Sequence, residues 1–279
     1  MITRCYLEIN NASKLDCVFC PKTVRKKHYL SIDEFDILTD KLRGRVKFLY
    51  FHLMGEPFLH PLLPEFIKVA RQKGFVPVLT TNGTLLSKSQ EVIEAKPHKI
   101  QISLHSQEGN GSECFEEYIH GVMAFARKAA LAGTLVVLRL WNQGGYDKKN
   151  DYIHDLIEMH QPRPWAVRSD GWKLTENLYI EYDCMFEWPD SKLAGFQEKD
   201  VFCYALRNQI GILVDGSVVP CCLDHDGDIT LGNLYRQPLD EILSSPRAKS
   251  LYDGFTRHTA TEFLCRRCGY AMVTKKYRE

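Results

Sequence analysis

The chain has 279 residues, of which 44% are hydrophobic and 25% are charged, and its net charge is +1. This composition is typical of a globular protein that buries a large core, and the length allows one or two domains. The balance of 36 basic against 35 acidic residues argues against a dedicated nucleic-acid-binding protein. No apolar run approaches the roughly 20 residues that cross a membrane. We therefore expect a cytoplasmic protein, whose ten cysteines serve metal binding, redox chemistry or packing rather than disulfides.

The first two thirds of the chain alternate short β-rich runs with longer helical patterns. Strands are expected at residues 6–10, 47–53, 76–81, 99–105, 135–142 and 178–183. Helices are expected at residues 87–96, 112–132 and 148–160, with two more beginning at Ser31 and after Pro61. Glu34 completes a capping box with Ser31, and Gly74 marks the end of the helix after Pro61. This alternation predicts an α/β fold with a parallel sheet, namely a partial (β/α)6 barrel that resembles a TIM barrel.

The pattern changes near Asp190. Residues 209–219 predict a hairpin around the two-residue turn Asp215-Gly216, and a short helix is expected at residues 238–245. Half of the ten cysteines lie in this last part of the chain. We therefore predict a barrel domain at residues 1–190 and a small cysteine-rich domain at residues 191–279.

The loop after the first strand contains Cys17 and Cys20, and a Cys-x2-Cys spacing lets two thiolates bind one metal centre. Such a pair alone is a weak signal, but loops that follow barrel strands lie on the face that carries the chemistry. The loop resembles the Cys-x3-Cys-x2-Cys motif of radical S-adenosylmethionine (radical SAM) enzymes. Ser13, Cys17 and Cys20 fall on its three cysteine positions, and Phe19 falls on the aromatic position before the last one.

The resemblance implies a [4Fe-4S] cluster that binds S-adenosylmethionine, and an external one-electron reductant such as flavodoxin or ferredoxin. Cleavage of S-adenosylmethionine would give a 5′-deoxyadenosyl radical that takes hydrogen from the substrate. Ser13 departs from the motif, because a hydroxyl is a harder and more basic ligand than a thiol. Three interpretations stay open: Ser13 binds iron as an alkoxide, the site has lost its cluster, or the chain is a variant of a competent parent. Cys5 is no obvious replacement, since it lies at the opposite end of the strand.

Residues after the other strands resemble cofactor contacts of the same family. Met54-Gly55-Glu56-Pro57 resembles its Gly-Gly-Glu-Pro motif, in which backbone groups and the acid contact the amino group of S-adenosylmethionine. Met54 replaces the first glycine. The resemblance also implies cofactor contacts for Asn82 and Ser103. Arg139 lies inside an apolar strand and needs an anionic or carbonyl partner, which the cofactor, the substrate or the fold could supply, and we assign it to the cofactor. Each signal is weak, but all fall at the carboxyl ends of successive predicted strands.

The C-terminal cysteines resemble the SPASM or twitch extension of radical SAM enzymes. The resemblance implies one auxiliary [4Fe-4S] cluster, and we assign its ligands as Cys203, Cys221, Cys265 and Cys268. Cys222 is left out because adjacent residues rarely both face one cluster. A structural zinc site with four cysteines is the alternative.

Family members with this extension modify peptides, mature sulfatases or dehydrogenate an aminocyclitol. The resemblance therefore implies an oxidoreductase that takes hydrogen from a peptide or small-molecule substrate, with no membrane partner. Ser13 leaves open a non-catalytic descendant that keeps the barrel as a binding or partner protein. A zinc-stabilised barrel with an unrelated activity is the third possibility.

Overall fold

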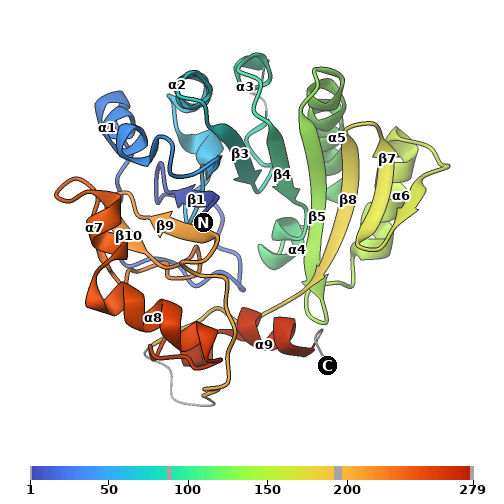
Figure 1. Cartoon of the computed structure of the whole chain (residues 1–279). Coiled ribbons are helices and arrows are strands. Elements are labelled where there is room, and N and C mark those ends of the chain that lie inside the picture. Colours follow the sequence, from blue (N-terminus) through green and yellow to red (C-terminus); the bar gives the residue numbers. More distant parts are fainter. Residues whose placement is uncertain (1, 87–89, 192–196, 277–279) are drawn as a thin grey trace.

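Six parallel strands form the wall of an open barrel in the computed structural model, which describes residues 2–86, 90–191 and 197–276 (Figure 1). In spatial order they are β1 (Arg4–Leu7), β2 (Phe48–Tyr50), β3 (Val76–Thr81), β4 (Lys99–Ser103), β5 (Leu135–Gln143) and β8 (Leu178–Cys184). Each strand pairs in parallel with the next one along this wall. The predicted partial (β/α)6 barrel is confirmed.

Helices between the strands cover the outer face of this wall (Figure 1). They are α1 (Ile32–Leu42), α2 (Leu63–Gln72), α3 (Gln90–Glu94), α5 (Phe115–Leu131) and α6 (Asn150–His160), whereas the short α4 (Ser106–Gly109) lies on the inner side, after β4. The capping box at the start of α1 is confirmed, because the Ser31 hydroxyl accepts from the Glu34 amide and the Glu34 carboxylate accepts from the Ser31 amide. Of the helix predicted at 87–96, residues 87–89 lie outside the described part of the chain.

Some short elements carry no strong sequence signal. These are α4, the 3₁₀ helix η1 (Pro57–Leu59), and an antiparallel hairpin of β6 (Ala166–Arg168) and β7 (Gly171–Thr175) that extends the sheet beyond β8. All of them have five residues or fewer, so hydrophobic periodicity has too little length to act on.

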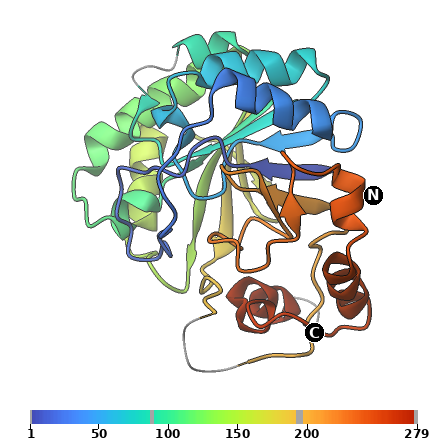
Figure 2. The ribbon, with the colours of Figure 1, turned by 90° about the vertical axis from the view of Figure 1, so that its left-hand side faces the viewer.

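The C-terminal part continues the same sheet on the other side of β1. Its strands are β9 (Gln209–Ile212), β10 (Ser217–Val219) and β11 (Gly232–Asn233), and its helices are α7 (Leu239–Leu243), α8 (Pro246–Thr256), η3 (Cys265–Arg267) and α9 (Gly269–Lys276). The predicted hairpin is confirmed, with Gly216 at φ +82° in the turn between β9 and β10. The turn is longer than the predicted two residues, because the Leu213 amide donates to the Ser217 carbonyl (2.9 Å) and residues 214–216 lie between them. Because β9 pairs in parallel with β1, the described strands form one sheet of eleven. Figure 2 shows α8 and α9 beside the open barrel.

The predicted boundary at residue 190 stays a prediction, and residues 192–196 of the expected join lie outside the described part. No helix among the described residues has the length and apolar character needed to span a bilayer.

The two faces of the barrel wall differ in chemistry. Leu49 and Phe51 are fully buried against the outer helices, where Phe35 stacks on Phe66 with ring centroids 4.2 Å apart. Burial of each such ring contributes roughly 2 kcal/mol. Side chains alternate along a strand, so the residues between them, such as Tyr50, face the barrel interior. The apolar core therefore lies outside the wall, and the interior is left for polar and aromatic groups.

Candidate functional site

Loops at the carboxyl ends of β1 to β4 are joined by hydrogen bonds into one rim. The Asn10 side chain donates to the Glu56 carbonyl (3.1 Å), and the Glu56 carboxylate accepts from the Asn82 amide (2.8 Å). The Ser106 hydroxyl lies 3.2 Å from the Asn82 carbonyl. The sequence predicted Glu56 and Asn82 on this face, whereas Asn10 and Ser106 were missed. The missed residues act through contacts distant in sequence, which local patterns do not reveal.

Glu56 is almost fully buried, and its carboxylate accepts from the Thr81 hydroxyl and the Phe58 and Asn82 amides. Burial raises the pKa of this carboxyl, and the three donors act in the opposite direction. In this structure the acid therefore fastens the loop after β2 to the end of β3. Gly55 lies directly against the Asn10 carbonyl, so that a Cβ there would overlap it. The close approach of these two loops requires a glycine.

The predicted cluster loop rests on the residues that follow β4. The Cys17 thiol lies 3.5 Å from the Ser106 carbonyl, and the Val18 amide donates to the Gly109 carbonyl (2.9 Å). The Phe19 ring lies directly against Gly109, where a Cβ would overlap it, and its centroid lies 5.5 Å from the His105 ring centroid. Phe19, predicted only as a motif position, thus seats the loop on α4. Gly109 was missed, because nothing in its local sequence indicates a contact with Phe19.

Cys17 and Cys20 lie close together, and Ser13 is exposed. Burial, followed by the neighbouring Cys20, raises the pKa of the Cys17 thiol to about 11. The Ser13 hydroxyl accepts a hydrogen bond from the Leu15 amide (3.2 Å) and so closes a local turn. The loop thus offers two thiols and one hydroxyl at the motif positions. Cys5 is fully buried within β1.

A buried ion pair fixes this loop to the C-terminal part of the chain. Arg25 forms two hydrogen bonds of 2.7 Å with Glu8, which is fully buried, and a third with the His225 carbonyl (2.9 Å). Glu8 also accepts from the Val214 amide (2.9 Å). Near it, the Thr23 hydroxyl donates to Asp226 (2.6 Å). Every member of this network is satisfied, which is the condition under which buried charges are stable.

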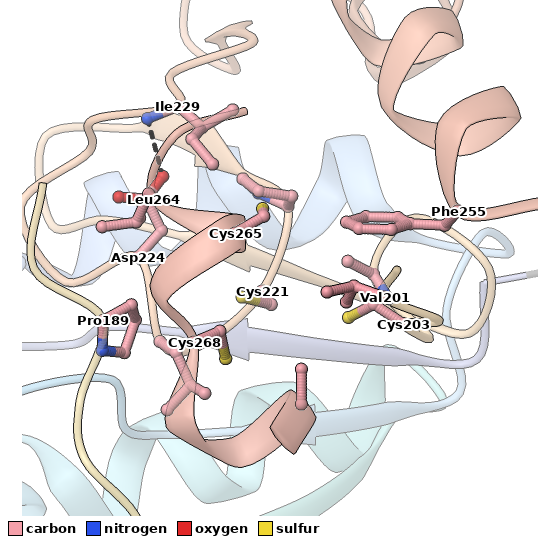
Figure 3. A pocket seen from close by; sticks show the side chains of 14 residues that line it. Pro189, Val201, Cys203, Cys221, Asp224, Ile229, Phe255, Leu264, Cys265 and Cys268 are labelled. Atoms are coloured by element: carbon pink, nitrogen blue, oxygen red, sulfur yellow. Dashed lines mark hydrogen bonds between the residues drawn. The ribbon is translucent and has the colours of Figure 1, made fainter. Parts of the chain in front are cut away.

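Four predicted cysteines surround one small cavity in the C-terminal part. They are Cys203 before β9, Cys221 after β10, and Cys265 and Cys268 at the two ends of η3 (Figure 3). The other lining side chains are mostly apolar, and they include Val201, Ile229, Phe255 and Leu264. No disulfide joins any of the ten cysteines.

The pKa values of the thiols around this cavity are raised. Burial raises the pKa of Cys221 and of Cys265 well above the ordinary value, and the neighbouring cysteines raise both further. Burial also raises the pKa of Cys268 to about 12. A metal centre replaces these protons, because a coordinated thiol is deprotonated. The donor set therefore fits a thiolate-bound metal centre.

Four thiolates can bind either a single zinc or an iron–sulfur cluster. A single zinc lies about 2.3 Å from each sulfur, which brings the four sulfurs close together. Among the described residues, no group of three or more His, Cys, Asp and Glu side chains is arranged to hold one metal ion. The four thiols line one cavity, and the assignment of an iron–sulfur cluster to it stays a prediction.

Cys222 points away from this group toward the barrel interior. It forms a hydrogen bond with Tyr6 of β1, and it lies close enough to Arg139 of β5 to affect its pKa. The exclusion of Cys222 from the predicted ligands agrees with this orientation. The ligand roles of the other four cysteines stay predictions.

Comparisons with known proteins address this C-terminal part first. Residues 203–269 match the family described as SPASM, an iron–sulfur cluster-binding domain. Over 87 residues the chain is 32% identical to the tungsten-containing aldehyde ferredoxin oxidoreductase cofactor-modifying protein of Pyrococcus furiosus. That match covers 29% of this chain and 24% of the relative, so the chain spans about a quarter of its length.

Solved structures of similar fold cover nearly the whole chain. A structure of anSMEcpe with bound AdoMet aligns with a TM-score of 0.68 at 11% identity, over 100% of this chain and 92% of that one. SuiB of Streptococcus suis aligns with a TM-score of 0.63 at 12% identity, over 100% and 74%. BtrN in an open conformation aligns with a TM-score of 0.59 at 16% identity, over 96% and 92%. The chain has the radical SAM fold with a C-terminal SPASM module.

Within this radical SAM fold, some residues on the interior wall were predicted from the sequence and others were not. Ser103 ends β4 and pairs in register with Arg139, as expected for residues on one face. Pro57 begins η1 and is buried, so it shapes the loop after β2. His52 was missed, although the alternation of Phe48, Tyr50 and His52 along β2 was the signal that would have placed it inside. The cofactor roles of Gly55, Glu56, Pro57, Asn82, Ser103, Arg139 and Phe19 stay predictions.

Proposed function

We propose that this chain is a radical SAM enzyme that takes a hydrogen atom from a peptide or small-molecule substrate held inside the partial barrel. One [4Fe-4S] cluster binds at Cys17 and Cys20 with Ser13 as the third ligand, and an auxiliary [4Fe-4S] cluster binds among the four cysteines of the SPASM module. When bound, the first cluster and S-adenosylmethionine together supply the radical chemistry. The observation that carries the proposal is the rim of strand-end loops, which surrounds Cys17 with backbone and side-chain groups in a fold that ends in a SPASM module.

The protein's own residues have separate tasks under this proposal. Phe19 and Gly109 fix the cluster loop, and the contacts of Glu56 hold the backbone of Gly55 at the rim. The apolar walls of the C-terminal cavity exclude water from the auxiliary cluster. Solvent exposure is one of the factors that set the reduction potential of an iron–sulfur cluster, so a dry cavity would tune the potential of the auxiliary cluster.

Known proteins of similar fold support both substrate classes. One structure of anSMEcpe contains AdoMet and the Cp18Cys peptide, and one of SuiB contains the precursor peptide SuiA. BtrN has been solved with AdoMet and 2-DOIA. A one-electron reductant such as flavodoxin or ferredoxin would supply the electron, and a cytoplasmic location stays a prediction from the cysteine content.

A second candidate function follows from Ser13. Its hydroxyl is exposed and already closes a turn with the Leu15 amide, which is the behaviour of a structural serine. On this alternative the chain keeps the barrel and the auxiliary site as a non-catalytic binding or partner protein.

Anaerobic reconstitution with iron and sulfide separates the two functions. The enzyme proposal expects about eight irons per chain, since each of two clusters holds four, and 5′-deoxyadenosine on reduction with dithionite. The non-catalytic alternative expects about four irons per chain and no cleavage of S-adenosylmethionine. In that case Ser13→Cys should raise the iron content to about eight and restore cleavage. Zinc without iron would contradict both cluster assignments.

A further inference from the structure

Two polar side chains in the barrel interior carry buried atoms without partners. They are Nε of Arg139 on β5 and Nδ1 of His52, two residues after β2. Neither atom has a hydrogen bond among the described residues. Buried polar atoms are rarely left unpaired in folded proteins, and such atoms indicate a missing partner. Because the two residues lie on opposite parts of one curved wall, that partner would lie between them.

The Arg139 guanidinium is held in a defined orientation. Its central carbon lies 3.3 Å from the centroid of the Trp141 ring, which is a stacked contact. Stacking occupies the flat face of a guanidinium and leaves its in-plane N–H groups available, and this edge matches the two oxygens of a carboxylate. Glu181 and Asp183 lie near enough to act on the charge of Arg139, but Glu181 is shared with Lys99 at 3.8 Å.

The electrostatics of the interior require a partner with negative charge. Burial lowers the pKa of Arg139 to about 10, which still leaves the guanidinium charged near neutral pH. Burial and the charge of Arg139 lower the pKa of His52 to about 3. A neutral imidazole can donate one hydrogen bond. The interior therefore offers a cation and a neutral donor to the same ligand.

We propose that Arg139 and His52 bind a carboxylate of the substrate inside the barrel. The site deepens the proposed function, on which it rests for calling the ligand a substrate. One negative charge suffices, because Glu181 and Asp183 already supply part of the neutralisation and would repel a doubly charged phosphate. Beside this site, Tyr6 and Tyr50 stack with centroids 4.7 Å apart and form an aromatic wall for the rest of the ligand.

The position of the site favours the substrate over the carboxylate of S-adenosylmethionine. Arg139 pairs in register with Ser103, the last residue of β4, and so lies at the base of the rim that carries the cluster loop. Its charge acts on Tyr50 and His52 on the β2 side of the interior and on Cys222 on the SPASM side. A ligand held there lies between the cluster loop and the auxiliary site, where a reacting substrate belongs.

Equilibrium dialysis of the full, reconstituted chain with radiolabelled benzoate and benzamide tests this site. The two probes share size and ring, and only benzoate carries the charge. We expect benzoate to bind at least about tenfold more tightly than benzamide. Arg139→Gln should weaken benzoate binding by about tenfold and leave radiolabelled S-adenosylmethionine binding within about twofold.

Two further variants keep the test decisive. His52→Phe keeps the ring but removes the donor, so benzoate binding should weaken by about threefold to tenfold without a change in charge. If circular dichroism shows that Arg139→Gln is unfolded, His52→Phe becomes the deciding variant. Arg163→Gln is the matched control, because Arg163 also stacks on a tryptophan, Trp165, but is paired with Glu158 at 2.9 Å. It should leave benzoate binding unchanged.

Three results would overturn the proposal. Equal binding of benzoate and benzamide would mean that the interior does not select a carboxylate. Parallel loss of benzoate and S-adenosylmethionine in Arg139→Gln would assign the arginine to the cofactor, and tighter binding of phenyl phosphate would exclude a carboxylate as the ligand. Failure of the proposed function gives a different pattern: no S-adenosylmethionine binding by the wild-type chain, with benzoate selectivity intact.

Discussion

The two cysteine regions of the molecule place comparable chemistry in opposite surroundings. The loop after β1 presents Cys17 and Cys20 beside an exposed Ser13, and it depends for its position on Gly109 and Arg25. In the SPASM module, four thiols enclose an apolar cavity and help to form its wall. The loop is therefore held in place by residues outside its predicted ligand set, whereas the four thiols of the module are also part of its packing. Substitution of one of these residues should therefore cost little stability in the loop and should disrupt the module more strongly.

The largest expected effect is on iron bound by the module. Cys221→Ser removes one of four thiols, so iron should fall by about four per chain, the content of one cluster. Cys222→Ser is the matched control, because its thiol forms a hydrogen bond with Tyr6 instead. Colorimetric iron analysis after anaerobic reconstitution measures both variants. Equal loss of iron from both would mean that the ligand is misassigned.

Breaking the link between the two regions should cost stability rather than ligands. Arg25→Gln leaves the fully buried Glu8 without its cation, and such a loss costs about 3–5 kcal/mol of unfolding free energy. Urea denaturation of the reconstituted chain measures it. Lys22→Gln removes an exposed lysine that pairs with Asp16, and the urea midpoint should not move. Similar midpoint shifts in the two variants would show that Arg25 does not join the regions.

A smaller effect is expected where the loop rests on α4. In Gly109→Ala the new methyl group overlaps the Phe19 ring, which should cost about 1–3 kcal/mol and lower iron at the first site only. Gly121→Ala on α5 meets open space and should stabilise the chain by up to about 1 kcal/mol. Thermal unfolding and iron analysis together distinguish the two. An unchanged iron content in Gly109→Ala would mean that the seat of Phe19 does not position Cys20.

The smallest effect concerns Ser13 itself. Ser13→Ala removes one exposed hydrogen bond to the Leu15 amide, so the unfolding free energy should change by about 0.5 kcal/mol or less. Iron at the SPASM module should not change. Urea denaturation gives the first quantity and iron analysis the second. A loss of several kcal/mol would show that the loop depends on Ser13 for its position and not only on Gly109 and Arg25.

Local signals in the sequence were sufficient for much of the fold. β3 occupies the predicted residues 76–81, and the capping box of α1 and the turn at Asp215-Gly216 lie where residue type requires them. β1 ends earlier than predicted, at Leu7. Beyond it, Asn10 turns its side chain to the loop after β2 instead of extending the ladder.

The candidate site was predictable only in part. Motif spacing named Cys17, Cys20 and the four C-terminal cysteines, and the structure brings the latter to one cavity. It could not name Gly109, which meets Phe19 from 90 residues away, because such contacts arise only when the loops after β1 and β4 come together. His52 was accessible from the alternation along β2, but a lone histidine has no distinctive pattern until its unpaired nitrogen is seen.

The pairing of β9 with β1 means that the C-terminal part cannot be removed without exposing an edge of the barrel sheet. Without β9, the amides and carbonyls of β1 would lie at a bare sheet margin, and such margins recruit strands from other chains. The module thus protects the barrel from self-association, apart from any metal it binds. Expression of residues 1–190 alone should therefore give aggregates rather than a smaller enzyme.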